Sequence, residues 1–185
     1  MNPAWFDQNN FQSQPWKNGQ GETLELIRVE NTKHPGDFVF RLSMATVKTS
    51  GPFSHYPGID RLLILVEGTH LILKRADGSV QRLHPLEVFS FAGEENIFSE
   101  ISSPCLDFNV MTNRIWGTST ARVLSVNKGD KLSLPANCYL YQLEGVLDYE
   151  GNEKMSRTLW EIKDAIEVES LTDSTSIIVE INYLS

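Results

Sequence analysis

Cysteine and histidine are scarce in this chain. Two cysteines and four histidines occur in 185 residues. Cys105 and Cys138 lie far apart, and neither belongs to a Cys-x-x-Cys or Cys/His spacing, so the usual zinc and dithiol motifs are excluded. We expect two buried free thiols, because free cysteine is among the most buried residue types.

Basic residues are also in deficit. The chain has 24 Asp and Glu against 16 Lys and Arg, a formal net charge of −8. Nucleic acids and anionic membranes bind a basic face, so we expect neither as a partner. A small anionic ligand remains compatible, since one arginine can pair with a carboxylate whatever the net charge.

Long apolar runs are absent as well. No stretch approaches the length of a membrane span, and the opening Met-Asn-Pro-Ala-Trp-Phe-Asp has neither the basic nor the continuous apolar region of a signal peptide. We therefore expect a cytoplasmic protein.

Short alternating segments take the place of long helical patterns. Residues 23–29 and 38–48 alternate between apolar and polar side chains, and residues 62–66 form a fully apolar strand. Turn signals recur about every eight to twelve residues, which is typical of an all-β sandwich or barrel.

Two expected strands, one at residues 23–29 and one at residues 107–111, carry polar side chains among apolar ones. Alternation puts Glu25 on one face with Ile27 and Val29, so its carboxylate is expected to point inward. If the core takes Phe108 and Val110, then Asp107 and Asn109 project from the other face and line the barrel or bond at its rim.

The second half of the chain reads as a degraded copy of the first. Glu67-Gly68 closes the apolar strand, and Glu144-Gly145 closes a similar one 77 positions later (144 minus 67). A period this long indicates a domain duplication. We predict two small barrels, residues 1–114 with the main pocket and residues 115–185 with a degenerate copy, with strand exchange between them allowed.

The order of strands and turns in residues 62–92 resembles a cupin, a double-sheet jelly roll. Metal-dependent cupins place a glutamate seven residues before the strand-closing glycine, after a His-x-His pair and before a further histidine. Here Arg61 takes the glutamate position, at most His55 survives of the pair, and Asn96 stands for the later histidine. An open metal site needs three or four donors, so we predict neither a metal nor another cofactor.

Arg61 changes what such a pocket can hold. A guanidinium offers a planar fork of donors that suits a carboxylate or phosphate. The alternative is a structural ion pair of Arg61 with Asp60 or Glu25.

The other candidate ligand-binding residues each have a structural alternative. His55 could bind the ligand or act as a base, or be an exposed loop residue. Aromatic side chains could wall the pocket or belong to the core. The full candidate set beside Arg61 and His55 is Trp16, Asn18, Phe40, Tyr56, Asp107 and Asn109, with Phe53 as a further aromatic.

Several blocks together resemble the HutD/Ves family. They are Trp16-Lys17-Asn18-Gly19 with Gly21-Glu22-Thr23 and Glu25, Asp37-Phe38 with residues 41–45, Gly51-Pro52-Phe53-Ser54 with residues 57–61, and residues 107–112 with Arg114. The resemblance implies a bicupin without the full cupin metal set and without an established catalytic activity. It also implies an association with histidine utilisation, where sensing or buffering a pathway intermediate would suit a formylated or formimino amino acid as ligand.

The sequence thus favours an all-β bicupin that binds a small carboxylate metabolite without metal, as a regulator or buffer of histidine-degradation intermediates. The alternative is a cupin enzyme, an isomerase or metal-dependent oxygenase, that uses His55 with Asp60 or Asp107. A third reading is an interaction module, and a homodimer is the candidate assembly.

Overall fold

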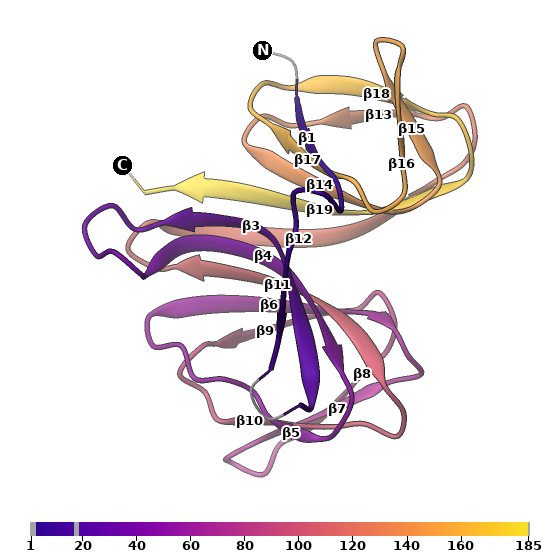
Figure 1. Ribbon diagram of the computed structural model, residues 1–185. Helices are drawn as coiled ribbons and strands as arrows, with labels where there is room; N and C mark the ends of the chain where they lie inside the picture. Colours follow the sequence, from indigo (N-terminus) through magenta and orange to yellow (C-terminus); the bar gives the residue numbers. More distant parts are fainter. Residues whose placement is uncertain (1–2, 17–18, 185) are drawn as a thin grey trace. The chain divides into compact units, whose positions relative to one another are not determined.

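The computed structural model describes residues 3–16 and 19–184, and its secondary structure there consists of β-strands (Figure 1). The all-β prediction is confirmed. Within the described residues, no helix has the length and apolar character to cross a membrane. The chain divides into two units, each with its own core. The N-terminal unit comprises Gln12–Thr118 with residues 183–184, and the C-terminal unit comprises residues 3–11 with Ser119–Asn182.

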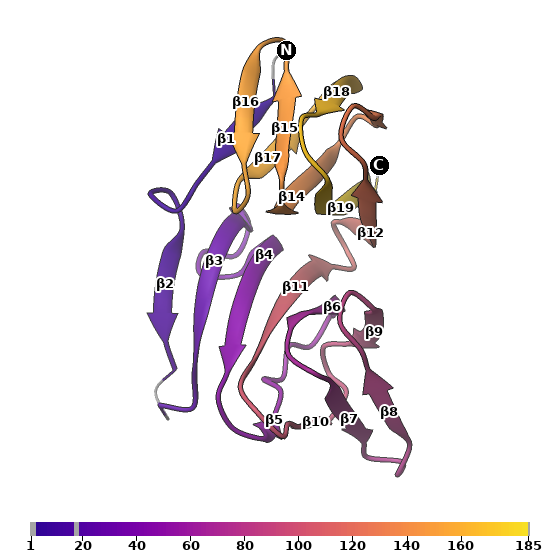
Figure 2. The same cartoon turned by 90° about the vertical axis from the view of Figure 1, so that its right-hand side faces the viewer.

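The N-terminal unit contains two sheets. The six-stranded sheet has the order β2 (Gln12–Pro15), β3 (Gly21–Glu30), β4 (Phe38–Val47), β11 (Cys105–Asn113), β6 (Ile59–Glu67) and β9 (Val88–Ala92). Figure 2 shows β2, β3, β4 and β11 side by side. The four-stranded sheet has the order β5 (Gly51–Pro52), β10 (Ile97–Glu100), β7 (Leu71–Arg75) and β8 (Val80–Leu83).

The core of this unit lies between its two sheets. Leu63 and Leu65 of β6 pack with Leu71 and Leu73 of β7, and all four are essentially inaccessible to solvent. One face of each sheet is therefore committed to apolar burial, which is what the alternation in the sequence requires. Any polar side chain on that face is drawn into the interior.

The C-terminal unit has two sheets of related order. Its five-stranded sheet runs β1 (Ala4–Phe6), β17 (Leu159–Ile162), β14 (Cys138–Glu144), β19 (Ser174–Tyr183) and β12 (Gly117–Val126). Its four-stranded sheet runs β13 (Lys131–Leu134), β18 (Ile166–Ser170), β15 (Val146–Tyr149) and β16 (Asn152–Met155). The first strand of the chain thus belongs to the C-terminal unit, beside β17 (Figure 1).

The two units share a strand order. The run β9-β6-β11-β4 in one unit matches β17-β14-β19-β12 in the other, and β5-β10-β7-β8 matches β13-β18-β15-β16. The two Glu-Gly dipeptides occupy equivalent places at the ends of β6 and β14, and Gly68 and Gly145 have φ of 128° and 87°. Only glycine adopts such backbone geometry without strain, which explains why the dipeptide recurs.

A β-bulge in β3 corrects one prediction. Glu25 pairs with Ser43 and Ile27 pairs with Leu42, so the register shifts at Leu26. Because paired residues share a face, Glu25 lies on the inner face, whereas Ile27 and Val29 lie on the opposite one. The inward position of Glu25 is confirmed, but its predicted sharing of a face with Ile27 and Val29 is wrong.

The predicted burial of both thiols is confirmed. Cys105 and Cys138 are free and buried. Burial raises the pKa of Cys105 to about 11 and that of Cys138 to about 12. Both thiols are therefore poor nucleophiles at neutral pH.

Candidate functional site

A polar cluster interrupts the inner face of the six-stranded sheet. Register places Arg41 and Arg61 on either side of Met111, in one row across β4, β11 and β6. In the next row Asn109 lies between Ser43 and Leu63, and in the one after it Asp107 lies between Ala45 and Leu65. Three neighbouring strands thus deliver the cluster, which no single stretch of sequence contains.

Arg61 is the centre of this cluster. It is 5% exposed, and its Nη2 donates to Asn109 Oδ1 at 2.7 Å, while its Nη1 donates to the Ser54 carbonyl at 3.3 Å. Its Nε is buried and has no partner among the described residues. Burial lowers the pKa of Arg61 to about 10, against the opposing effect of Asp107, so the guanidinium stays charged at neutral pH.

Aromatic rings surround the guanidinium. The Arg61 Cζ atom lies 4.7, 5.1 and 5.7 Å from the ring centroids of Phe91, Phe53 and Tyr56. Each distance falls within the range of a cation–π contact, which partly replaces the hydration that burial removes. Phe53, Ser54 and Tyr56 belong to one segment, so residues 53–56 cover Arg61.

Asp107 is the second buried charge-bearing group. Its side chain is fully inaccessible, and its Oδ1 accepts a hydrogen bond from Asn109 Nδ2. Its Oδ2 is buried and has no partner in the described part of the chain. Burial raises the pKa of Asp107 to about 7, although Arg61 and the Asn109 amide act in the opposite direction. Arg61 therefore reaches Asp107 through the Asn109 amide.

The predicted ion-pair alternatives for Arg61 are contradicted. Asp60 accepts from Arg114 at 2.6 Å, and Glu25 accepts from Arg41 at 2.7 Å. Arg114 also pairs with Glu94, which lowers the pKa of that carboxyl to about 2. The two acids expected to neutralise Arg61 are thus engaged with other arginines.

The structure brings some of the remaining candidates to Arg61 and not others. Tyr56 contacts the Arg61 guanidinium. Trp16 packs against the apolar core of the N-terminal unit, and its Nε1 donates a hydrogen bond to Thr23 Oγ1 at 2.8 Å. The predicted place of Phe40 in the pocket wall is wrong. Phe40 is fully buried on the opposite face of β4, where its ring stacks on that of Trp116 with 5.7 Å between the ring centroids. Alternation along β4 separates it from Arg41 and Ser43, so Phe40 does not wall this site.

His55 is not part of the cluster. His55 is exposed, while Asp107 is enclosed and Asp60 is held by Arg114, so this geometry does not assemble the His–Asp pair of the enzyme hypothesis. Asn18 lies outside the described residues.

Phe91, Arg41 and Ser43 are neighbours of the site that were not predicted from the sequence. Arg41 and Ser43 carried a signal, since they are polar residues on the face of β4 that also bears Ala45 and Val47. Phe91 carried none, because its place beside Arg61 depends on the pairing of β9 with β6.

No group of three or more His, Cys, Asp or Glu side chains gathers to hold a metal within residues 3–16 and 19–184. In the polar cluster the described donors of that kind are Asp107, with an unpaired oxygen, and Glu25, which Arg41 already binds.

The C-terminal unit differs at the equivalent positions. Cys138 lies seven residues before Gly145, in the position that Arg61 has relative to Gly68. The pairing of β14 with β19 puts Ser176 and Ile178 where Asp107 and Asn109 stand in the N-terminal unit. All three are buried, and the surrounding core is apolar around Trp160. The charged cluster is therefore particular to the N-terminal unit.

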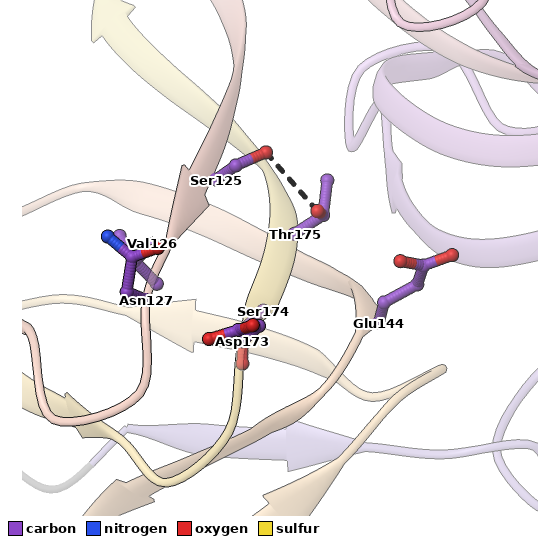
Figure 3. Close-up of a pocket in the computed structure, with 7 residues that line it drawn as sticks. All are labelled: Ser125, Val126, Asn127, Glu144, Asp173, Ser174 and Thr175. Carbon is purple, nitrogen blue, oxygen red and sulfur yellow. Dashed lines mark hydrogen bonds between the residues drawn. The ribbon is translucent and has the colours of Figure 1, made fainter.

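A polar hollow of about 200 Å³ lies elsewhere in the C-terminal unit (Figure 3). The Ser125 and Thr175 hydroxyls are hydrogen-bonded to each other at 3.2 Å, and the Glu144 carboxylate stands apart from them (Figure 3). Its lining residues are Ser125, Val126, Asn127, Glu144, Asp173, Ser174 and Thr175. With hydroxyls and carboxylates but no cation, it does not resemble an anion site.

Known structures share this fold over the whole chain. A conserved protein of unknown function, PA5104 from Pseudomonas aeruginosa PAO1, is 20% identical with a TM-score of 0.85, and covers 98% of this chain and 100% of its own. HutD from Pseudomonas fluorescens SBW25, solved in a formate condition, is 23% identical with a TM-score of 0.81, and both chains are covered completely. YhhW from Escherichia coli is 8% identical with a TM-score of 0.73, and covers 99% of this chain and 97% of its own.

These likenesses establish a cupin-like all-β fold. The HutD family model matches residues 8–177, which is most of the chain. The resemblance seen in the sequence is thereby confirmed, and the chain belongs to the HutD family.

Proposed function

We propose that this protein binds a small carboxylate metabolite in its N-terminal unit, with Arg61 as the anion-binding residue and without metal. Asp107 and Asn109 orient the polar groups of the ligand, and Tyr56, Phe53 and Phe91 supply the apolar surroundings. The protein acts in the cytoplasm as a sensor or buffer.

The observation that carries the proposal is a pair of unsatisfied buried polar atoms in one cluster. Arg61 Nε and Asp107 Oδ2 both lack partners, and Asn109 bridges the two side chains. Native proteins leave few buried polar atoms unpaired, and such groups commonly await a ligand or a water. A carboxylate is the group whose geometry best suits a guanidinium.

We further propose that both units are cupin domains, so that the chain is a bicupin. The repeated strand order supports this reading. The positions equivalent to Arg61, Asp107 and Asn109 carry no charge in the C-terminal unit, which favours one anion site per chain.

The ligand we favour is an intermediate of histidine degradation, such as a formylated or formimino amino acid. Membership of the HutD family supports that class. Among solved structures of related fold, one is described as an oxalate decarboxylase formate complex, from Lactobacillus farciminis, 8% identical with a TM-score of 0.68. That protein offers a precedent for a small carboxylate on this fold.

Thermal unfolding with a panel of acids tests the proposal. The panel contains formate, acetate, succinate, glutamate and N-formylglutamate, all at neutral pH. A true ligand at about 100 times its dissociation constant should stabilise the protein by roughly 2.7 kcal/mol. Arg61→Ala should abolish that response. Arg122→Ala is the matched control, because Arg122 is a half-exposed arginine of the C-terminal unit. An Arg61→Ala protein that responds as the wild type does would refute the anion site.

A further inference from the structure

Asp107 has two properties that do not fit a simple counter-charge to Arg61. Its directly paired neighbours on either side are Ala45 and Leu65, which are apolar and buried. Within residues 3–16 and 19–184 its carboxylate accepts one hydrogen bond, from Asn109, and its Oδ2 has no partner. Arg61 directs its Nη2 to Asn109 and its Nη1 to Ser54, so no guanidinium hydrogen bond to Asp107 is made.

Resting on the proposed function, we infer that the anion binds to the form of the site in which Asp107 carries a proton, and that Asp107 donates this proton in a hydrogen bond to the anion. Asp107 is then a specificity-determining residue for charge, and anion binding above the titration range of the free site takes up one proton.

Burial of Asp107 as an unpaired carboxylate would be costly. An ionised carboxylate removed from water needs several donors or a direct cation, and a group that lacks them is neutralised instead. Asp107 has one amide donor and no exposed surface. The raised pKa of Asp107 agrees with this geometry.

The charged groups around Asp107 are mostly neutralised by partners of their own. The titratable groups on the inner face around Asp107 are Arg61 on β6, Arg41 on β4, Glu25 and Arg28 on β3, Cys105 on the same strand and Tyr56 on the covering segment. Glu25 neutralises Arg41 and Glu30 neutralises Arg28 in direct pairs, and Cys105 remains a thiol because its pKa is raised. The charge of the cluster thus depends on Arg61 and Asp107 alone.

Protonation of Asp107 leaves the guanidinium of Arg61 uncompensated, which favours one anion. Ionisation of Asp107 makes the cluster neutral and places a carboxylate beside the incoming one, where like charges repel. In the protonated form, both orphan atoms can act as donors: Arg61 Nε–H and the hydroxyl on Asp107 Oδ2. A single carboxylate accepts from both.

The direction of the pH dependence follows. The binding-competent protonated form is complete below the pKa of free Asp107, about 7, and is lost as the pH rises through it. Affinity for an anion should therefore be constant in mildly acidic solution and fall by up to about tenfold per pH unit above that point.

Calorimetric titration with formate and with N-formylglutamate tests this from about pH 5.5 to 8.5. Measurement in two buffers of different ionisation enthalpy counts the protons taken up. We expect uptake to approach one per anion at the alkaline end. Asp107→Asn keeps a neutral donor of similar shape, so it should bind with little pH dependence and no proton uptake. Asp164→Asn, at an exposed position of the C-terminal unit, should keep the wild-type profile.

A measurement without ligand protects the inference from a failure of the probes or of the variant. Infrared spectroscopy of the wild type at about pH 6 should show the carbonyl band of a protonated carboxylic acid, at a pH where ordinary Asp and Glu are ionised. The band should be absent from Asp107→Asn, and selective carboxyl labelling of aspartate should shift it in the wild type.

The outcomes separate the two proposals. Binding of an anion with the same affinity and no proton uptake at all pH values would overturn the inference and leave the proposed function standing. Absence of the protonated-acid band would also overturn the inference. A band without binding of any acid in the panel would support the protonated state and count against the proposed ligand class.

Discussion

At the scale of single residues, the ion pair between Glu25 and Arg41 is the most consequential contact outside Arg61. Both side chains are 12% exposed, with 2.7 Å between Glu25 Oε2 and Arg41 Nε. Removal of one partner from a largely buried pair strands the other charge. Glu25→Ala should therefore destabilise the protein by about 3 kcal/mol in urea unfolding.

An exposed pair provides the control for that prediction. Glu167 and Lys131 bond at 3.0 Å with more than half of each side chain exposed. Glu167→Ala should cost less than about 1 kcal/mol. Equal losses in the two variants would show that the Glu25 pair is not held in a low-dielectric environment.

The sequence predicted several site residues at this scale, but not their partners. Counting from Gly68 identified Arg61, and alternation in β11 put Asp107 and Asn109 together on one face, as the structure has them. Alternation within one strand could not show that Asp60 and Glu25 bind other arginines. Strand pairing brings Asn109 to Arg61, Arg114 to Asp60 and Arg41 to Glu25. Such partners come from segments tens of residues away.

At the scale of elements, the covering segment 53–56 is held against the turn after β9. Tyr56 N donates to the Gly93 carbonyl and Gly93 N donates to the Ile59 carbonyl, both at 2.7 Å. A Cβ atom on Gly93 would lie 2.3 Å from the Tyr56 carbonyl oxygen. Backbone on both sides leaves no room for it.

Gly93→Ala should therefore displace the covering segment and expose Arg61. We expect faster amide hydrogen exchange at residues 53–59 and a loss of stability of about 1–3 kcal/mol, the range for overpacking. Gly51→Ala, in β5 just before the covering segment, is the matched control, since its Cβ would meet only Gln20 Oε1 at 3.9 Å. Unchanged exchange at residues 53–59 in Gly93→Ala would mean that this segment is not anchored there.

Strands were easier to predict than their registers. The expected segments 38–48 and 62–66 correspond to β4 and β6, whose alternation or apolar content is continuous. The bulge at Leu26 was not foreseeable, because an extra residue in one strand leaves no mark on its own hydrophobic pattern. The shift in register at Leu26 determines which side chains of β3 after Glu25 face the interior.

At the scale of the whole molecule, the first strand completes the core of the C-terminal unit. Trp5 packs edge-on against Trp160 with 5.8 Å between ring centroids, and Lys154 lies over the Trp5 ring at 4.3 Å. Trp5→Ala should destabilise this unit by about 3 kcal/mol, the lower bound for removing a large aromatic, since Trp5 is only partly buried.

Amide exchange resolved along the chain checks this. Protection in Trp5→Ala should fall in β14 and β17, whereas β4, β6 and β11 should keep wild-type protection because they belong to a separate core. An equal fall in both sets would show that the two units unfold as one cooperative body.

Two Glu-Gly dipeptides predicted two related halves between which strands could be exchanged, but they did not indicate that the first strand is the one that crosses. Residues 4–6 carry no pattern that distinguishes one apolar core from another, and the predicted boundary left them with the N-terminal half. The structure assigns residues up to Phe11 to the other unit and places the second division at Thr118.

That crossing has a consequence for synthesis on the ribosome. Ala4 pairs with Glu161, so β1 leaves the exit tunnel of the ribosome long before its strand neighbour β17. At roughly 5–20 residues per second, the interval is on the order of ten seconds or more. Throughout that time the N-terminal unit can fold while β1 remains unpaired, so the C-terminal unit is completed only after β17 has emerged.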